Sequence, residues 1–415
     1  MHADRRSFLS SLGALSAAGF LAPGALAQSP RAHGASGDPV VPRGLAASTD
    51  IMLEPGLTYL QTGSLGPTPR PVMERTLAVW RELELDPTSK GYGPIESAME
   101  QVRAKAAAFI GCATDELVLT RSTSEGLNWV AQGISWSAGE RIITTDQEHP
   151  GGRACWDWVV RKYGVHLDVV VIPPGENDPS LIVERFAQRL TPKTRVLAFS
   201  HLLTSTGLRM PVAELSALAR RAGCLSVVDG AQAVGGVAVN VKALGCHAYA
   251  TSGHKWLLAP KGTGLLYLAR DLAGRIDPIA LQSGREAYTA SSGVTSLPSV
   301  HGIAAAIAYQ EAIGTPKIEA HNLALGRYLW NALTGVPKVR VVSAAPGPLA
   351  SPLLTYTLPA GVHAGALQQH LLNAHRVLVK VVPANFLIGH RISTHLFNTE
   401  RDVDALIAAL KAELG

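Results

Sequence analysis

The residues Thr251-Ser252-Gly253-His254-Lys255-Trp256-Leu257 follow a second apolar run, Val227-Val228-Asp229-Gly230, so that Lys255 lies 26 residues after Asp229. A lysine amine can form a Schiff base with an aldehyde, and a buried aspartate can pair with a protonated ring nitrogen. Strand ends that carry such groups are typical of the carboxyl edge of an open α/β sheet, where ligands bind. The two runs therefore indicate a site for a charged aromatic aldehyde. The alternative is a core strand followed by an ordinary surface turn.

Short β-branched runs alternate with helical patterns over most of the chain. The expected strands are 117–119, 141–145, 167–172, 196–200, 226–229, 247–251 and 264–267, with helices at 125–132, 151–162, 181–190 and 212–222. Apolar runs without polar alternation indicate strands that are covered on both faces. Their alternation with helices predicts an α/β fold with a mainly parallel, seven-stranded sheet.

The pattern changes after Gly314 to a smaller α+β arrangement with antiparallel strands. We expect helices at 321–333, 364–373 and 400–414, and strands near 340–343, 353–358, 377–382 and 391–396. A chain of 415 residues is too long for one compact core. We therefore predict a large domain at 65–310 and a small C-terminal domain at 311–415, with residues 48–64 packed against the small domain.

The N-terminus resembles a twin-arginine export signal at residues 1–27. Arg5 and Arg6 precede a modest apolar stretch that ends in Ala25-Leu26-Ala27. Glycines and a proline within that stretch argue against a stable transmembrane helix. Residues 28–47 are rich in Gly, Pro, Ser and Ala and are predicted to be a linker. We expect a protein that the twin-arginine translocation machinery exports folded to the periplasm; a disordered cytoplasmic tail is the alternative.

Composition restricts the partners of the chain. The net charge of +5 is spread without a basic run, so no nucleic-acid partner is expected. The 47% hydrophobic and 17% charged residues fit a soluble globular protein. None of the four cysteines forms a C-x-x-C pair, so no metal site is predicted.

Three further polar motifs follow expected strands. Hydroxyls and free N–H groups at Arg121-Ser122-Thr123-Ser124-Glu125 open a helix and can bind a phosphate, although simple helix capping is the alternative. His149, at the end of the next strand, could stack on a flat ring or be a solvated turn residue. Thr204, in Ser200-His201-Leu202-Leu203-Thr204, could contact a ring hydroxyl or only stabilise a turn.

The run Ser252-Gly253-His254-Lys255-Trp256-Leu257-Leu258-Ala259-Pro260-Lys261-Gly262-Thr263-Gly264 is similar to a motif of the class V aminotransferase superfamily, whose fold is fold-type I. The resemblance covers about residues 50 to 412 and is closest to isopenicillin N epimerase-like members. Because it also carries an export signal, the chain is similar as well to the periplasmic enzyme that tailors pyoverdine. The family resemblance implies pyridoxal 5'-phosphate as the cofactor and a homodimer as the assembly.

The resemblance also implies roles for individual residues. Lys255 would be the Schiff-base lysine and proton shuttle, and Arg391 would grip the substrate carboxylate, assisted by the loop at Gly63 and Ser64. A surface ion pair is the alternative for Arg391. The residues implied in cofactor binding are Thr123, Ser124, His149, Thr204, Asp229, Gln232, Ser252, His254 and Lys255, with Thr295 reaching the phosphate from a partner subunit.

The expected function is chemistry at the α-carbon of an amino acid or an amino-acid-containing secondary metabolite, by transamination or epimerisation. One alternative is a C–S lyase or β-eliminase, and another is a non-catalytic exported binding protein. Residues 374–395 contain no cysteine, so a desulfurase-type persulfide is not expected. A hydrolase is not favoured either, because Ala250 occupies the first glycine position of a G-x-S-x-G elbow around Ser252.

Overall fold

A computed structural model describes residues 42–415 except 273 and 385. The predicted signal at 1–27 and most of the predicted linker lie outside these residues. The C-terminal part of that linker is structured, however. Strand β1 (Pro42–Arg43) pairs antiparallel with β2 (Ala46–Ala47), and Leu45 N–H donates to the carbonyl of Leu396. Ala46 is buried beside Leu396, so the last residues of the predicted linker pack against the C-terminal part of the chain.

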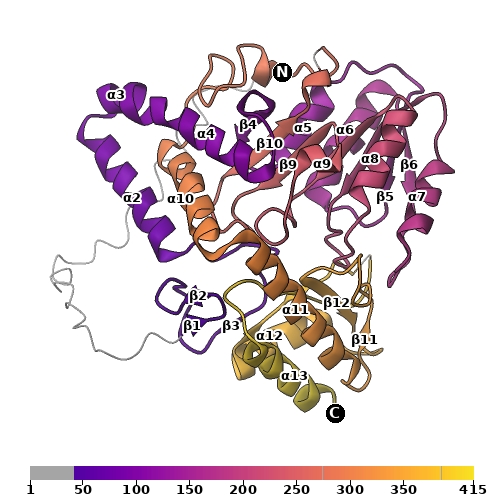
Figure 1. Ribbon diagram of the computed structural model, residues 1–415. Coiled ribbons are helices and arrows are strands. Elements are labelled where there is room, and N and C mark those ends of the chain that lie inside the picture. The colour runs from indigo at the N-terminus through magenta and orange to yellow at the C-terminus, as the bar shows by residue number, and fades with distance from the viewer. Residues whose placement is uncertain (1–41, 273, 385) are drawn as a thin grey trace, which may run out of the picture. The chain divides into compact units, whose positions relative to one another are not determined.

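A seven-stranded sheet organises the larger part of the fold (Figure 1). Its order is β4-β10-β9-β8-β7-β5-β6, and every pairing is parallel except those of β10 with β4 and β9. The strands are β4 (Leu117–Thr120), β5 (Arg141–Thr145), β6 (His166–Val170), β7 (Thr194–Ser200), β8 (Leu225–Asp229), β9 (Ala248–Ser252) and β10 (Gly264–Leu268). The expected mainly parallel α/β sheet is confirmed.

Helices cover both faces of this sheet. On one face α5 packs against α6, and on the other face α7, α8 and α9 pack in sequence (Figure 1). Their bounds are α5 (Thr123–Gly133), α6 (Pro150–Tyr163), α7 (Pro179–Ala187), α8 (Val212–Arg221) and α9 (Val241–Leu244). Strands β8, β9 and β10 are buried at every position, as expected of strands covered on both faces, and this burial includes the polar residues Ser226, Asp229 and Thr251.

Three longer helices, which were not predicted from the sequence, flank the sheet. Helix α10 (Leu297–Ile313) packs against α2 (Arg70–Leu85) and α4 (Glu96–Ile110), and short α3 (Pro87–Lys90) follows α2. Helix α10 is apolar around most of its circumference, so it lacks the one-sided stripe that identifies a surface helix.

The C-terminal part has its own sheet and its own apolar core. The sheet order is β11-β12-β15-β14, all antiparallel, from β11 (Arg340–Val341), β12 (Leu353–Thr357), β15 (Gly389–Ser393) and β14 (Lys380–Val381). Helices α11 (Thr315–Thr334) and α12 (Ala364–His375) pack against this sheet, and α13 (Glu400–Leu414) packs against those two helices. The core includes Leu329, Tyr356, Leu371, Ile392 and Leu406.

The single strand expected at 377–382 is two strands. The first, β13 (Val377–Leu378), pairs in parallel with β3 (Thr58–Tyr59), whereas β14 joins the four-stranded sheet. Between them, the carbonyl of Val379 leaves both ladders and accepts hydrogen bonds from Gln61 and Gln368. The β3–β13 pair ties the segment before residue 64 to the C-terminal part. Within the described residues, no helix is both long and apolar enough to span a bilayer.

Candidate active site

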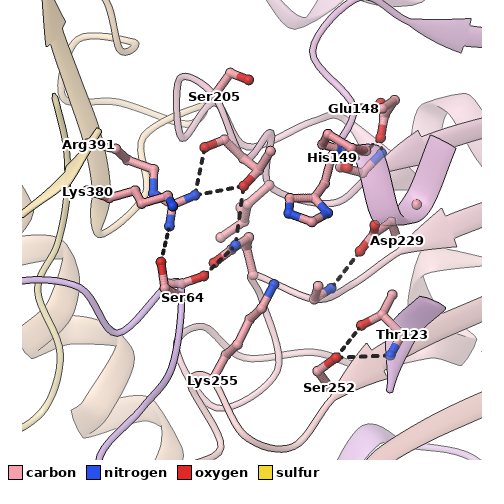
Figure 2. A pocket seen from close by; sticks show the side chains of 18 of the residues that line it. Ser64, Thr123, Glu148, His149, Ser205, Asp229, Ser252, Lys255, Lys380 and Arg391 are labelled. Atoms are coloured by element: carbon pink, nitrogen blue, oxygen red, sulfur yellow. Dashed lines mark hydrogen bonds between the residues drawn. The ribbon is translucent and has the colours of Figure 1, made fainter. Parts of the chain in front are cut away.

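A cavity of about 500 Å³ lies at the carboxyl ends of β4, β5, β7, β8 and β9. It is closed on one side by the loop after β3 and by residues of β14 and β15. Every site residue predicted from sequence lines it except Thr295, as Figure 2 shows for the labelled ones. The lining predicted residues are Gly63, Ser64, Thr123, Ser124, His149, Thr204, Asp229, Gln232, Ser252, His254, Lys255 and Arg391.

Asp229 and Lys255 give the cavity a buried carboxylate and a lysine amine. Asp229 is 8% exposed, and its side chain accepts a hydrogen bond from Ala231 N–H at 2.9 Å. Burial raises the pKa of Asp229, while the positive charge of Lys255 opposes the rise. Burial lowers the pKa of Lys255 to about 8, against the opposing pull of Asp229. A buried carboxylate with so little compensation is suited to a cationic ligand.

The turn that carries Lys255 is held on both sides. Trp256 is buried, donates its indole N–H to Gln232 Oε1 at 2.8 Å, and accepts hydrogen bonds at its carbonyl from Gln310 and His395. Leu258 has φ 60°, a left-handed conformation that is uncommon for a leucine. Because a side chain at Gly66 would meet the carbonyl of Lys255 at 2.1 Å, only glycine lets the N-terminal loop approach this turn. Lys255 therefore projects from a rigid turn.

The N-terminus of α5 forms the anion-binding end of the cavity. Ser122 caps the helix by accepting from Glu125 N–H at 3.2 Å. Ser252 Oγ accepts from Thr123 N–H at 2.9 Å and also bonds Thr123 Oγ1 at 2.8 Å. His254 Nδ1 is buried without a hydrogen-bond partner. Hydroxyls, N–H groups and an unpartnered imidazole nitrogen at a helix N-terminus fit a phosphate.

His149 and Glu148 follow β5 and lie next to each other at the cavity wall. His149 Nδ1 accepts from Gly151 N–H at 3.0 Å, which caps α6. Burial, assisted by Lys255 and other nearby cations, lowers the pKa of His149 to about 4, so its imidazole is neutral at pH 7. Burial raises the pKa of Glu148 to about 7. The sequence reading singled out His149 but missed Glu148, although both stand at the same strand end.

Arg391 lies in the middle of β15 and is 6% exposed. Its Nη1 donates to Thr204 Oγ1 at 2.8 Å and to the carbonyl of Thr204 at 3.1 Å, and its Nη2 donates to Ser64 Oγ at 3.2 Å. Burial lowers its pKa to about 10, so the guanidinium stays charged at neutral pH. Arg391 has no ion pair among the described residues, and its buried Nε has no acceptor. It is a positioned cation rather than half of a surface ion pair.

Gln232 connects the N-terminal loop to the lysine turn. Its amide nitrogen donates to the carbonyl of Gly63 at 2.9 Å and to Thr204 Oγ1 at 3.4 Å, while its oxygen accepts from Trp256. Its expected contact with the cofactor, like that of Thr204, stays a prediction.

Thr295 lies outside the cavity, immediately before α10. It lines a separate surface hollow with Tyr92, Tyr288 and Val294. Within one subunit it therefore cannot contact the phosphate end, and its expected role depends on a partner subunit.

No cysteine lines the cavity among the described residues, which include all four cysteines. Cys155, which lies on α6 after His149, is the cysteine nearest in sequence to a residue of the cavity. It is buried, and its burial raises the pKa of the thiol to about 12. Lys380, Asp146, Ser200, Ser205 and Phe386 line the cavity but were not singled out from the sequence. Little in the sequence indicates that Lys380 belongs to the site, because the two-residue strand that carries it is too short to show a periodic pattern.

Comparison with known proteins agrees with this architecture. A model of the family Aminotransferase class-V matches residues 58–406. Isopenicillin N epimerase from Amycolatopsis lactamdurans is 31% identical over 389 residues, which cover 88% of this chain and 97% of that protein. A cysteine desulfurase from Salmonella typhimurium is 30% identical, with 85% and 92% covered. A solved complex between the cystine C-S lyase C-DES and its reaction product cysteine persulfide has a TM-score of 0.78 and 25% identity, with 86% and 98% covered.

Proposed function

Because this chain belongs to the class-V aminotransferase family of pyridoxal-phosphate-dependent enzymes, we propose that it acts at the α-carbon of an amino acid or an amino-acid-containing secondary metabolite. The proposed reaction is transamination, epimerisation or related carbanion chemistry. The observation that carries the proposal is one cavity that joins Lys255, Asp229 and Arg391. Membership of an enzyme family sets aside the alternative of a non-catalytic binding protein.

The cavity fits pyridoxal phosphate. The buried Asp229 carboxylate would pair with the ring nitrogen, and the ring would lie against His149. Thr123, Ser124, Ser252 and the unpartnered nitrogen of His254 would hold the phosphate at the start of α5. When bound, the cofactor supplies an aldehyde and an electron-withdrawing ring that stabilises negative charge at the substrate α-carbon.

The side chains of the chain itself supply position and proton transfer. With a pKa lowered to about 8, Lys255 is partly neutral at slightly alkaline pH and can accept a proton from the α-carbon at its Nζ. Arg391 offers N–H donors in a planar fork to the α-carboxylate and so fixes which substituent faces Lys255. Whether the proton returns to the same carbon decides between epimerisation and transamination.

A C–S lyase reaction is the second candidate, because the cystine C-S lyase C-DES shares the fold at 25% identity. The absence of a cysteine from the cavity lining, within the described residues, favours elimination without a protein persulfide. Release of cysteine persulfide, ammonia and an oxo acid from cystine would support this candidate over the first. Retention of the carbon–sulfur bond would exclude it.

We also propose that the chain is exported folded by the twin-arginine machinery and works in the periplasm as a homodimer. Arg5-Arg6 and Ala25-Leu26-Ala27 support export, and the family resemblance supports a homodimer, in which Thr295 would reach the cavity of the partner subunit. Replacing Arg5 and Arg6 with lysine should leave the precursor in the cytoplasm. Light scattering of the purified protein tests the dimer, and a monomeric mass would refute it.

The test of the central proposal is an absorption spectrum of the purified protein supplied with pyridoxal phosphate. A visible band should appear, shift on addition of a substrate amino acid and disappear on borohydride reduction. The Lys255→Ala variant should lack the borohydride-sensitive band, whereas Lys261→Ala, which alters another lysine of the same motif, should keep it. A native protein without any such band would contradict the proposal.

A further inference from the structure

Two cationic side chains stand next to each other at one end of the cavity. Lys380 on β14 is directly paired with Arg391 on β15 in an antiparallel ladder, so both side chains project from the same face. Both line the cavity, and Figure 2 shows them together on the side away from Asp229 and Glu148. Like charges at paired positions destabilise a sheet unless an anion compensates them. Their juxtaposition inside a ligand cavity therefore needs an explanation.

The protein itself does not supply the compensating charge. Arg391 donates only to neutral oxygens of Thr204 and Ser64, and Lys380 has no ion pair with any described residue. The carboxylates that line the cavity are engaged elsewhere. Asp146 accepts from Ile172 N–H, and Glu148 accepts from Thr145 and Ser200.

The proposed function uses only one of the two cations. Asp229 would be neutralised by the cofactor ring, the phosphate end is separate, and the α-carboxylate of the substrate would occupy Arg391. Lys380 is then left as an unpaired, solvent-accessible cation beside the substrate. The wall next to it is apolar, formed by Val381, Val382, Pro383 and Phe386, and would cover a hydrocarbon stem.

We propose that Lys380 binds a second anionic group of the substrate, so that the enzyme prefers α-amino acids whose side chain ends in a carboxylate or a comparable anion. This inference rests on the proposed function, because it takes Arg391 as the partner of the α-carboxylate. Lys380 selects the substrate in this arrangement and does not take part in proton transfer. The apolar wall accommodates the methylene groups between the two anionic ends.

Binding of matched amino acids tests the inference. The shift of the cofactor band is titrated with L-glutamate against L-glutamine and with L-aspartate against L-asparagine, since each pair differs mainly in charge. The wild-type protein should bind at least one acid roughly 10- to 100-fold more tightly than its amide, as expected for a charge-assisted hydrogen bond. Lys380→Gln should remove that preference and leave binding of the amide unchanged. Lys380→Arg should retain the preference, and so should Lys317→Gln, which alters an exposed lysine outside the cavity.

Two results would overturn the inference while leaving the proposed function intact. One is a normal cofactor band without a preference for either acid. The other is equal weakening of acid and amide in Lys380→Gln, which would mean that Lys380 and Arg391 share one carboxylate. Calorimetry with glutarate and butyrate provides a readout that needs no reaction. A protein that lacks the cofactor band but binds glutarate through Lys380 would refute the proposed function and keep the anion site.

Discussion

Replacing Glu148 with glutamine should remove a pH-dependent loss of stability from the cofactor-free protein. The Glu148 carboxylate accepts from Thr145 Oγ1 at 2.6 Å, from Ser200 Oγ at 2.5 Å and from Ser200 N–H at 3.3 Å. A glutamine keeps one acceptor oxygen for Thr145 and the Ser200 N–H. Its amide can donate to Ser200 Oγ, because that hydroxyl can rotate and accept instead. Glu148→Gln therefore changes the charge and little else.

Burial sets both the sign and the size of the effect. It raises the pKa of Glu148 from its ordinary value of 4.5 to about 7, and the nearby charge of Asp229 adds to the rise. At pH values between 4.5 and about 7, Glu148 keeps its proton in the folded state but has lost it in the unfolded state. The stabilisation is therefore fully present below pH 4.5 and is lost as pH rises through 7. A shift of this size corresponds to roughly 3 kcal/mol in the free energy of unfolding.

Urea denaturation of the cofactor-free protein at pH 5 and pH 8 measures this difference. Between the two pH values, the wild type should lose about 2–3 kcal/mol more than Glu148→Gln, and the variant should be the more stable protein at pH 8. Glu74→Gln, at an exposed position of α2, is the matched control and should follow the wild type. Parallel pH profiles for wild type and Glu148→Gln would refute the raised pKa of Glu148.

Three further substitutions test the geometry of the site. Arg391→Gln should weaken binding of amino-acid substrates roughly 10- to 100-fold and leave the cofactor band intact; unchanged substrate binding would contradict the carboxylate role. Ser252→Ala removes the acceptor of Thr123 N–H and should weaken pyridoxal phosphate binding by about 1 kcal/mol in a fluorescence titration, whereas equal affinity would place the phosphate elsewhere. Trp256→Phe leaves Gln232 Oε1 without its indole donor and should destabilise the fold by about 1–3 kcal/mol, which thermal denaturation would detect.

The sequence alone determined the α/β sheet and the residues at its carboxyl edge. The expected strands of that sheet are mainly apolar and lack a regular polar alternation, because strands covered on both faces need none. Ligands bind at the carboxyl ends of the strands in an open α/β sheet, and this rule predicted that Thr123, His149, Asp229 and Lys255 lie along one edge of the sheet. Such inferences succeed because they depend only on residues within one segment and on a topology that repeats.

Only the tertiary structure decided the features that depend on packing between distant segments. It split 377–382 into strands of two different sheets, and that split placed Lys380 beside Arg391. It partly buried Glu148 beside Ser200, and this desolvation raises the pKa of the carboxyl; it also left Thr295 outside the cavity of its own subunit. Register, burial and charge proximity arise from the packing of the whole chain, and local periodicity carries no information about them.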